Sequence, residues 1–199
     1  MNIKAKKTMK FFLYFFGKIL AAAIAVWVAW FAFNTAMNSS NVNVIVKDAF
    51  TKRASVILEP LENSDTALLP KIFTPDFLHK TGLDVQQDNK YYNVTLYSQR
   101  TDVQTALVLP SAKKVELTVT DVIEDVRATL VNEDAADFEQ KDSLIGSGVY
   151  KVTAVKTEEN SWMIDNIELL EEITPDIVRP LPTPAPADIT DADEGTEQA

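Results

Sequence analysis

The feature that most constrains this chain is an apolar stretch of 23 residues near its N-terminus, from Phe11 to Phe33. Only Gly17 and Lys18 interrupt the stretch. A helix of that length measures roughly 34 Å at 1.5 Å per residue, and the hydrocarbon core of a bilayer is roughly 30 Å thick. We therefore expect residues 11–33 to form a single transmembrane helix.

Lys18 is compatible with a spanning helix because of its position. A lysine costs roughly 2.5–3.5 kcal/mol at the centre of a bilayer, but much less near a helix end. Lys18 lies one turn inside the expected boundary, so its flexible stem can carry the ammonium group to the lipid headgroups. Aromatic residues, which favour the two interfaces, lie towards both ends of the stretch: Phe11, Phe12, Tyr14, Phe15 and Phe16 at one, Trp27 and Trp30 at the other.

The distribution of charge predicts the orientation of the helix. No acidic residue precedes Asp48, and such an excess of cations is typical of the cytoplasmic side. We expect residues 1–10 to form a basic cytoplasmic tail that touches anionic lipid, with the rest of the chain outside the cytoplasm. A cleaved signal peptide is the alternative, although Asn34-Thr35-Ala36 fits a cleavage site poorly. The lysines on the N-terminal side are Lys4, Lys6, Lys7, Lys10 and Lys18.

Small side chains recur along one face of the expected helix. Such a ridge allows two helices in lipid to approach closely and associate. Alanine is also simply a common helix former, so both interpretations remain open. The residues of this ridge are Ala21, Ala25, Ala29, Ala32 and Ala36.

The part of the chain after the span is strongly acidic. The whole chain has 19 basic and 29 acidic residues, and without the five N-terminal lysines the balance is 14 − 29 = −15. Nucleic acid and anionic lipid repel such a domain, so we expect no nucleic-acid partner. The chain has no cysteine, which excludes a disulfide scaffold, a thiol nucleophile and a thiolate metal site.

Helical signals dominate the first part of the acidic domain. Residues 34–43 are polar and show no periodicity, which predicts a linker. An amphipathic helix is expected next, with Pro60 bending or ending it. Its apolar stripe comprises Val46, Ala49, Phe50, Ala54, Ile57, Leu58 and Leu61.

Two shorter helices are expected to follow. Ser64 or Asp65 can cap the first, which Pro70 interrupts. Thr74-Pro75-Asp76 is a strong start signal for the second, because it combines an N-cap residue, a proline in the first turn and an acid facing the helix dipole. Gly82 provides the residue that ends this helix.

Alternation with period two then predicts strands. Residues 92–109 resemble a hairpin with its turn at 99–102. Residues 113–131 predict one long strand in which the apolar parity changes, so we expect a bulge or bend near Thr120-Asp121. Two last strands are expected at 149–157 and 162–170.

The composition changes again after residue 172. Prolines are followed by acids, and such a segment buries too little apolar area to fold, which predicts a disordered acidic tail over residues 173–199. A ligand for a proline-recognition domain is the alternative. The folded domain is therefore expected at residues 44–172.

Helices followed by an antiparallel sheet with one long bent strand indicate the α+β class. This order, together with the phrases KIFTPDFL (71–78) and SWMIDNIELL (161–170), resembles the nuclear-transport-factor-2-like cone superfamily. The resemblance implies that a curved antiparallel sheet wraps around two or three helices and leaves a pocket between them. A basic tail, one span and an external cone are also similar in layout to the bitopic scaffold proteins of conjugation and type IV secretion systems.

Several residues are candidates for chemistry. His79 is the only histidine, and without a paired Ser, Cys or metal ligand it is typical of a surface or packing residue. Asp121 lies at the expected bend and Asp165 follows Trp162, so either can point into a cone pocket, although strand charges usually face solvent. The tyrosines are expected to line the sheet: Tyr91, Tyr92, Tyr97 and Tyr150.

One dense group of carboxylates lies between the long predicted strand, residues 113–131, and the last two strands. It lacks the regular spacing and central glycine of a calcium loop, so a solvated acidic loop is expected. The sequence also lacks a glycine-rich phosphate loop, a zinc pattern and a nucleophile elbow. The carboxylates are Glu133, Asp134, Asp137, Glu139 and Asp142.

These observations lead to one main hypothesis. We assign no catalytic, cofactor-binding or metal-binding residue, and expect a non-enzymatic, membrane-anchored scaffold that binds itself or other envelope proteins. The alternative is a small-molecule-binding or catalytic cone with Asp121, Asp165 or His79 in its pocket.

Overall fold

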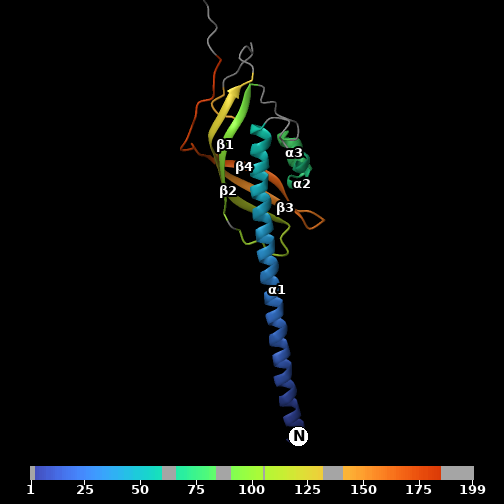
Figure 1. Ribbon diagram of the computed structural model, residues 1–199. Coiled ribbons are helices and arrows are strands. Elements are labelled where there is room, and N and C mark those ends of the chain that lie inside the picture. Colours follow the sequence, from blue (N-terminus) through green and yellow to red (C-terminus); the bar gives the residue numbers. More distant parts are fainter. Residues whose placement is uncertain (1–2, 60–65, 84–90, 105, 132–140, 185–199) are drawn as a thin grey trace, which may run out of the picture.

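In a computed structural model, the chain forms one long helix, two short α-helices, a 3-10 helix of one turn and a curved four-stranded antiparallel sheet (Figure 1). The structure describes residues 3–59, 66–83, 91–104, 106–131 and 141–184. The α+β class expected from the sequence is therefore confirmed. In chain order the elements are α1 (Ile3–Leu58), η1 (Thr66–Leu68), α2 (Leu69–Ile72), α3 (Pro75–Thr81), β1 (Tyr92–Val103), β2 (Lys114–Leu130), β3 (Gly148–Lys156) and β4 (Trp162–Glu172).

Helix α1 is continuous over 56 residues, which corresponds to a length of roughly 84 Å. Its N-terminal half projects away from the domain, and its C-terminal half lies against the sheet (Figure 1). The polar linker predicted at residues 34–43 is therefore wrong, because these residues are helical throughout. The domain is joined to the apolar segment by an unbroken helix.

Tertiary contacts explain why a polar segment stays helical. Val42 has no exposed surface, and Ser39 Oγ accepts a hydrogen bond from the backbone N–H of Val108 at 3.0 Å. The side chains of Asn34 and Thr35 donate to the carbonyl oxygens four residues earlier, at 2.8 and 2.9 Å. Packing and local hydrogen bonds thus outweigh the weak intrinsic helix preference of Asn, Ser and Thr.

The C-terminal half of α1 forms the centre of the core. It contacts β1 and β4, the two edge strands, and also β3, so the sheet curves around the helix. Most of the predicted apolar stripe is buried, and burial of each large side chain stabilises the fold by roughly 1.5–3 kcal/mol. The buried members of the stripe are Val46, Ala49, Phe50, Ala54 and Leu58; Ile57 is half-buried and Leu61 lies outside the described residues.

The short helices cover one end of the sheet. Thr74 caps α3 as predicted, its Oγ1 accepting from the backbone N–H of Phe77 at 3.2 Å, and Gly82 ends the helix with φ of 63°. Pro70 lies in the first turn of α2, which begins at Leu69, rather than interrupting a helix; a missing N–H is tolerated there. The backbone N–H of Thr74 donates to the carbonyl of Ile164 at 2.9 Å, which ties the α2–α3 connection to β4.

The sheet has the order β1-β2-β3-β4. Strand β1 pairs with β2 along its length, so the turn predicted at residues 99–102 is wrong. The prediction failed because this part of β1 has polar residues on both of its faces. Arg100 and Asp102 are exposed on one face, whereas Thr101 on the other face contacts the buried polar residue Asp121. The last two strands agree with the predicted ranges to within two residues.

The predicted change of parity in β2 is confirmed, but it occurs at Asp125. The register between β1 and β2 slips there, and Asp125 has φ of 52°, which is typical of a bulge. The residues facing the core have odd numbers before Asp125 and even numbers after it. They are Leu117, Val119, Asp121 and Ile123, then the half-buried Val126, Ala128 and Leu130.

The first part of the predicted disordered tail is ordered. Residues 173–184 follow the outside of the domain, where the backbone N–H of Asp125 donates to the carbonyl of Ile177 at 3.3 Å and Leu181 is buried. The acids that suggested disorder begin at Asp188, whereas this segment contains apolar residues that can pack. Residues 185–199 lie outside the described part of the chain.

The close approach of β3 to β4 generates a prediction about Gly148. A Cβ atom at this position would lie 2.5 Å from the carbonyl oxygen of Glu171 and 2.5 Å from Cδ1 of Leu169. We expect Gly148→Ala to lower the free energy of unfolding by about 1–3 kcal/mol, because the backbone has to move to accept the methyl group. Urea denaturation of the full chain in detergent micelles measures the change.

Gly146→Ala is the matched control, since a Cβ atom at Gly146 meets no atom within 4 Å. Equal losses of stability in the two variants would contradict the close packing described for Gly148.

Candidate functional site

Asp121 is the one acidic side chain among the described residues that is fully buried. It lies in the middle of β2, on the same face as Val119 and Ile123, opposite Thr101 of β1 and Gly148 of β3. This face packs towards α1, so the carboxylate is enclosed between the sheet and the helix. The sequence left the direction of Asp121 open, with solvent as the usual side for a strand charge; in the structure the side chain faces the interior, and the bend expected beside it lies at Asp125.

Neutral hydrogen-bond donors surround the buried carboxylate. Thr101 Oγ1 donates to Oδ1 of Asp121 at 2.7 Å, and Gln99 Nε2 lies 2.9 Å from Oδ1 and 3.2 Å from Oδ2. Gln99 Nε2 is also 3.3 Å from the carbonyl oxygen of Phe50 in α1. The amide of Gln99 thus connects the backbone of α1 with the polar centre of the sheet.

Burial raises the pKa of Asp121, because desolvation disfavours the ionised carboxylate. The hydrogen bonds from Thr101 and Gln99 and the positive charge of Arg53 oppose this rise without cancelling it. The guanidinium of Arg53 lies 5.6 Å from the centre of the Tyr150 ring. A perturbed, charge-coupled carboxylate is a feature of functional sites and also of buried structural networks.

A cavity of about 190 Å³ lies further along β2, between the bulge at Asp125 and the C-terminal segment. It is smaller than the roughly 300–1,000 Å³ of typical small-molecule sites. Asp121 does not line it, so the buried carboxylate and this cavity are separate features. Its apolar walls include Ile123, Ile145, Ile177, Val178 and Leu181, and its polar walls include Asp125, Asp142 and Arg179.

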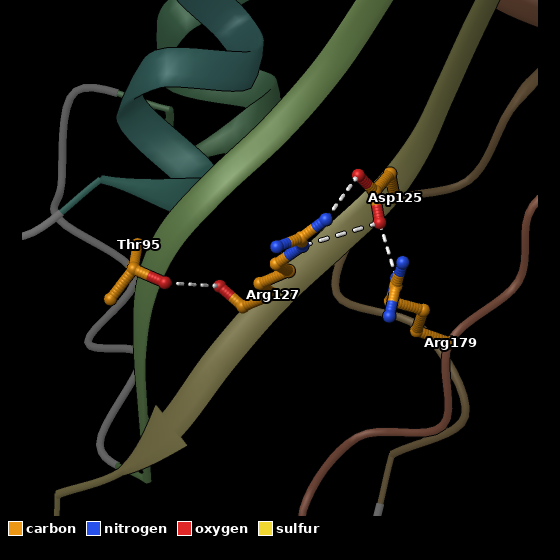
Figure 2. Close-up of polar contacts among 4 residues, drawn as sticks. All are labelled: Thr95, Asp125, Arg127 and Arg179. Atoms are coloured by element: carbon orange, nitrogen blue, oxygen red, sulfur yellow. Dashed lines mark hydrogen bonds and ion pairs between the residues drawn. The ribbon is translucent and has the colours of Figure 1, made fainter.

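The bulge at Asp125 carries a second polar cluster, which Figure 2 shows. Arg127 Nη2 donates to Oδ2 of Asp125 at 3.2 Å, and Arg179 Nε donates to Oδ1 from the C-terminal segment. Thr95 Oγ1 donates to the carbonyl of Arg127 at 3.2 Å and so joins the two strands beside the bulge. Hydrogen bonds from Arg127 and Arg179 lower the pKa of Asp125. This cluster holds the segment 173–184 against β2.

The structure separates the other candidates named from the sequence. His79 is exposed in the last turn of α3. Asp165 is half-buried and accepts a hydrogen bond from Thr74 Oγ1 at 3.1 Å, so it positions the start of α3. These contacts give Asp165 a structural role.

Two of the tyrosines line the sheet and carry identified hydrogen bonds. Tyr97 donates to Oε1 of Glu59 at 3.1 Å, and burial together with the negative charge of Glu59 raises the pKa of Tyr97 to about 12. Tyr150 donates to the carbonyl of Gly146 at 2.8 Å and packs against Phe50 with 5.3 Å between ring centres. Tyr92 is buried and Tyr91 half-buried at the start of the same sheet.

Metal ligands do not gather in the part of the chain that the structure describes, where no group of three or more His, Asp or Glu residues is placed to hold an ion. Asp142 is described and lines the cavity. The other carboxylates of the acidic loop, Glu133, Asp134, Asp137 and Glu139, lie outside the described residues.

Comparisons with protein-family models, with curated proteins and with solved structures find no match for this chain. What the domain does must therefore follow from its own residues.

From the sequence we did not identify the residues that surround Asp121, which are Arg53, Gln99 and Thr101. Reading residues 92–103 as one regular strand would still have missed Gln99 and Thr101, because alternation from the buried Tyr92 and Val94 places odd-numbered residues outside. The register shifts between Val94 and Ser98 bring Gln99 and Thr101 to the inner face.

Asp121 and Asp125 lie four residues apart on β2 and are expected to affect stability in opposite directions. The folded state holds the proton of Asp121 more tightly than the unfolded chain does, so Asp121 lowers the free energy of unfolding as pH rises above about 4. Asp121→Asn is expected to be at least as stable as the native chain at pH 7. Urea denaturation between pH 3 and 7 measures the difference, which should disappear at the acidic end.

Asp125→Asn is the matched comparison, because asparagine tolerates the positive φ at this position. The lowered pKa of Asp125 means that its ionised form stabilises the fold at neutral pH and that this contribution is lost on acidification. This variant should be less stable at pH 7, and added salt should reduce the loss. A large loss for Asp121→Asn at pH 7 would instead show that the charge of Asp121 is required.

Proposed function

We propose that this protein is a single-pass membrane protein that holds a scaffold domain outside the cytoplasm, where the domain binds other envelope proteins or a second copy of itself. The N-terminal lysines support a cytoplasmic N-terminus. The retained helix is the anchor in this proposal, in place of a cleaved signal peptide.

The observation that carries the proposal is the continuity of α1. Residues 11–33 are exposed except for Phe31, and the described part of the chain contains one helix that is long and apolar enough to cross a membrane. A soluble protein rarely exposes so large a contiguous apolar surface, which favours lipid as its solvent. The same helix continues into the centre of the domain core, so the proposed anchor and the element on which the sheet packs form one continuous rod.

The arrangement of the domain supports the resemblance to the nuclear-transport-factor-2-like cone superfamily. A sheet that contacts α1 through β1, β3 and β4, with α2 and α3 at one end, is the kind of packing expected of a cone. Its interior is filled by large apolar side chains, which favours a binding scaffold over a ligand pocket. We further propose that the protein is part of a conjugation or secretion assembly. The support for this step is the layout of the chain, with a basic tail, one span and an external domain.

The second half of β4 is the best-supported contact surface for a partner. Leu169 and Leu170 are 52% and 55% exposed on this edge strand. The connection at Thr74 covers the first half of β4, whereas no described strand pairs with the outer edge of the second half. Open edges and exposed leucines are typical of surfaces that another chain covers.

Charge favours a partner of a different kind over a second copy at this surface. The two leucines lie among exposed glutamates, and a second acidic copy would be repelled by them. A partner with apolar and basic groups would complement both features. The glutamates are Glu168, Glu171 and Glu172.

A small-molecule-binding or catalytic cone is the second candidate, because Asp121 is buried with a raised pKa. Its carboxylate is enclosed and receives hydrogen bonds from Gln99 and Thr101, which explains its burial without a ligand. A loss of ligand binding or activity in Asp121→Asn, with stability retained, would favour this candidate.

The membrane topology can be tested with single cysteines, because the native chain has none. Val131→Cys, at an exposed position, should react with a membrane-impermeant maleimide in intact cells whose outer layers admit the reagent. Lys4→Cys should react only after the membrane is disrupted. Labelling in the opposite order would show that the orientation is inverted, and a chain shortened near residue 36 by mass spectrometry would show that the segment is a cleaved signal.

The contact surface can be tested by photo-crosslinking in the cells that make the protein. A photoreactive amino acid at Leu170 is expected to give a discrete adduct with a basic envelope protein. The same substitution at Leu96, which is 48% exposed on the opposite edge strand β1, is the matched control. Adducts at Leu96 and none at Leu170 would contradict the assignment, and an adduct of twice the chain mass would identify a second copy as the occupant.

A further inference from the structure

We propose that the β1–β2 loop, residues 106–113, is a second membrane contact that dips its exposed leucines into the lipid headgroup layer beside α1. The inference rests on the proposed function, in which residues 11–33 cross the bilayer. It adds a site that the transmembrane helix does not provide, with a lipid surface as its ligand.

The loop lies at the end of the domain nearest to the apolar half of α1 (Figure 1). The backbone N–H of Val108 donates to Ser39 Oγ at 3.0 Å, and Asn38 Nδ2 donates to the carbonyl of Leu109 at 3.4 Å. These two hydrogen bonds fasten the loop to α1 just beyond Phe33, the last residue of the apolar segment.

The distance along α1 places the attachment of the loop just beyond the outer edge of the headgroup layer, within reach of a leucine side chain. Ser39 follows Phe33 by six residues, which is roughly 9 Å of helix at 1.5 Å per residue. The headgroup layer occupies about 5–8 Å on each side of the hydrocarbon core. Thr35, only two residues after Phe33, is already buried by the domain. A leucine that projects from this end of the domain therefore reaches lipid.

The side chains of the loop have the chemistry that such a contact requires. Val108 is 1% exposed and faces the core, whereas its neighbours Leu107 and Leu109 are 77% and 44% exposed. Neighbours of an inward-facing residue in an extended segment point away from the core. In the sequence, residues 103–112 carry no charge, which is unusual in so acidic a domain.

The lysines near the loop do not make the membrane contact depend on anionic lipid. Lys113 and Lys114 follow the leucines, but Lys114 Nζ lies 3.6 Å from Oε1 of Glu116, so part of this charge is already paired. The backbone of Lys113 accepts a hydrogen bond from the N–H of Lys156 at 2.8 Å, which fixes the base of the loop to β3. The contact we infer is apolar, and neutral lipid should suffice for it.

A second contact would fix the orientation of the domain on the membrane. A single helix allows the domain to tilt, whereas a loop in the headgroup layer on one side of α1 opposes the tilt in that direction. Strand pairing sets Val103 against Val119 at the loop end and Tyr92 against Leu130 at the other, so Val131 lies at the end of the sheet away from the loop.

Depth-dependent quenching of a fluorophore tests the inference. The full chain carrying Leu107→Cys, labelled with an environment-sensitive fluorophore, is reconstituted in vesicles of neutral phosphatidylcholine that contain lipids with a shallow nitroxide. We expect blue-shifted emission and quenching at least threefold greater than for the same label at Val131→Cys. Addition of anionic lipid should leave the ratio unchanged within a factor of two.

A label at Ile24→Cys, measured in vesicles whose lipids carry the nitroxide deep in the acyl chains, separates failure of this inference from failure of the proposed function, because Ile24 lies near the middle of the expected span. If the label at Ile24→Cys is quenched and the label at Leu107→Cys is quenched no more than that at Val131→Cys, the transmembrane helix is supported and the loop contact is contradicted. If Ile24 is not quenched, the proposed membrane anchor itself is wrong.

A second set of variants tests the leucines themselves, because the fluorophore no longer replaces one of them. With the fluorophore at Ser111→Cys, the double substitution Leu107→Asp and Leu109→Asp should reduce quenching at least twofold while the circular dichroism stays unchanged. Ser111 is exposed and follows Leu109 by two residues in the same loop. Unchanged quenching in the folded double variant would show that the leucines do not make the contact.

Discussion

The packing of the second half of α1 against the curved sheet is the interaction on which the rest of this structure depends. One helix provides the apolar segment of residues 11–33 and also the central rod of the core, where Phe50 and Leu58 are almost completely buried. Because both edge strands of the sheet contact this rod, the sheet closes around it without pairing edge to edge. Folding of the domain and its attachment to the N-terminal segment are therefore one physical event, with no flexible joint between them.

The two aspartates of β2 show how position along one strand decides the role of the same chemical group. Asp121 precedes the bulge and faces inwards, where Gln99 and Thr101 satisfy it and burial raises its pKa. Asp125 forms the bulge and faces the C-terminal segment, where two arginines lower its pKa. The bulge thus ends the inner polar network and begins an outer one that fastens the segment 173–184. A carboxylate that is enclosed and satisfied by neutral donors is well suited to fix the register between sheet and helix.

Much of this fold could be predicted from the sequence, and the errors have physical causes. The apolar stripe from Val46 to Leu58, the cap at Thr74 and the last two strands follow from periodicity and capping preferences, which are local properties. The helix through residues 34–43 could not be predicted, because it depends on contacts with Val108 and Leu109, some 70 residues away in sequence. Gln99 and Thr101 could not be placed from the sequence either. Their polar side chains resembled those of a turn, and only the folded sheet brings them to Asp121. Local rules fail here where a distant partner satisfies a polar group.

In the function that we propose, the rigid connection between the apolar helix and the domain has a consequence for how a partner binds. The first half of β4 is tied to the α2–α3 connection, so the second half is the part that can accept another chain. A flexible linker would let this edge meet partners at any height above the bilayer, whereas a continuous helix allows one height and a narrow range of tilt. Under this proposal, the entropy lost on orienting the domain is lost when the protein folds and inserts, before a partner binds. For a partner held in the same membrane, as the proposed function allows, a weak and partly apolar surface such as that of Leu169 and Leu170 is then sufficient, because both molecules are already oriented.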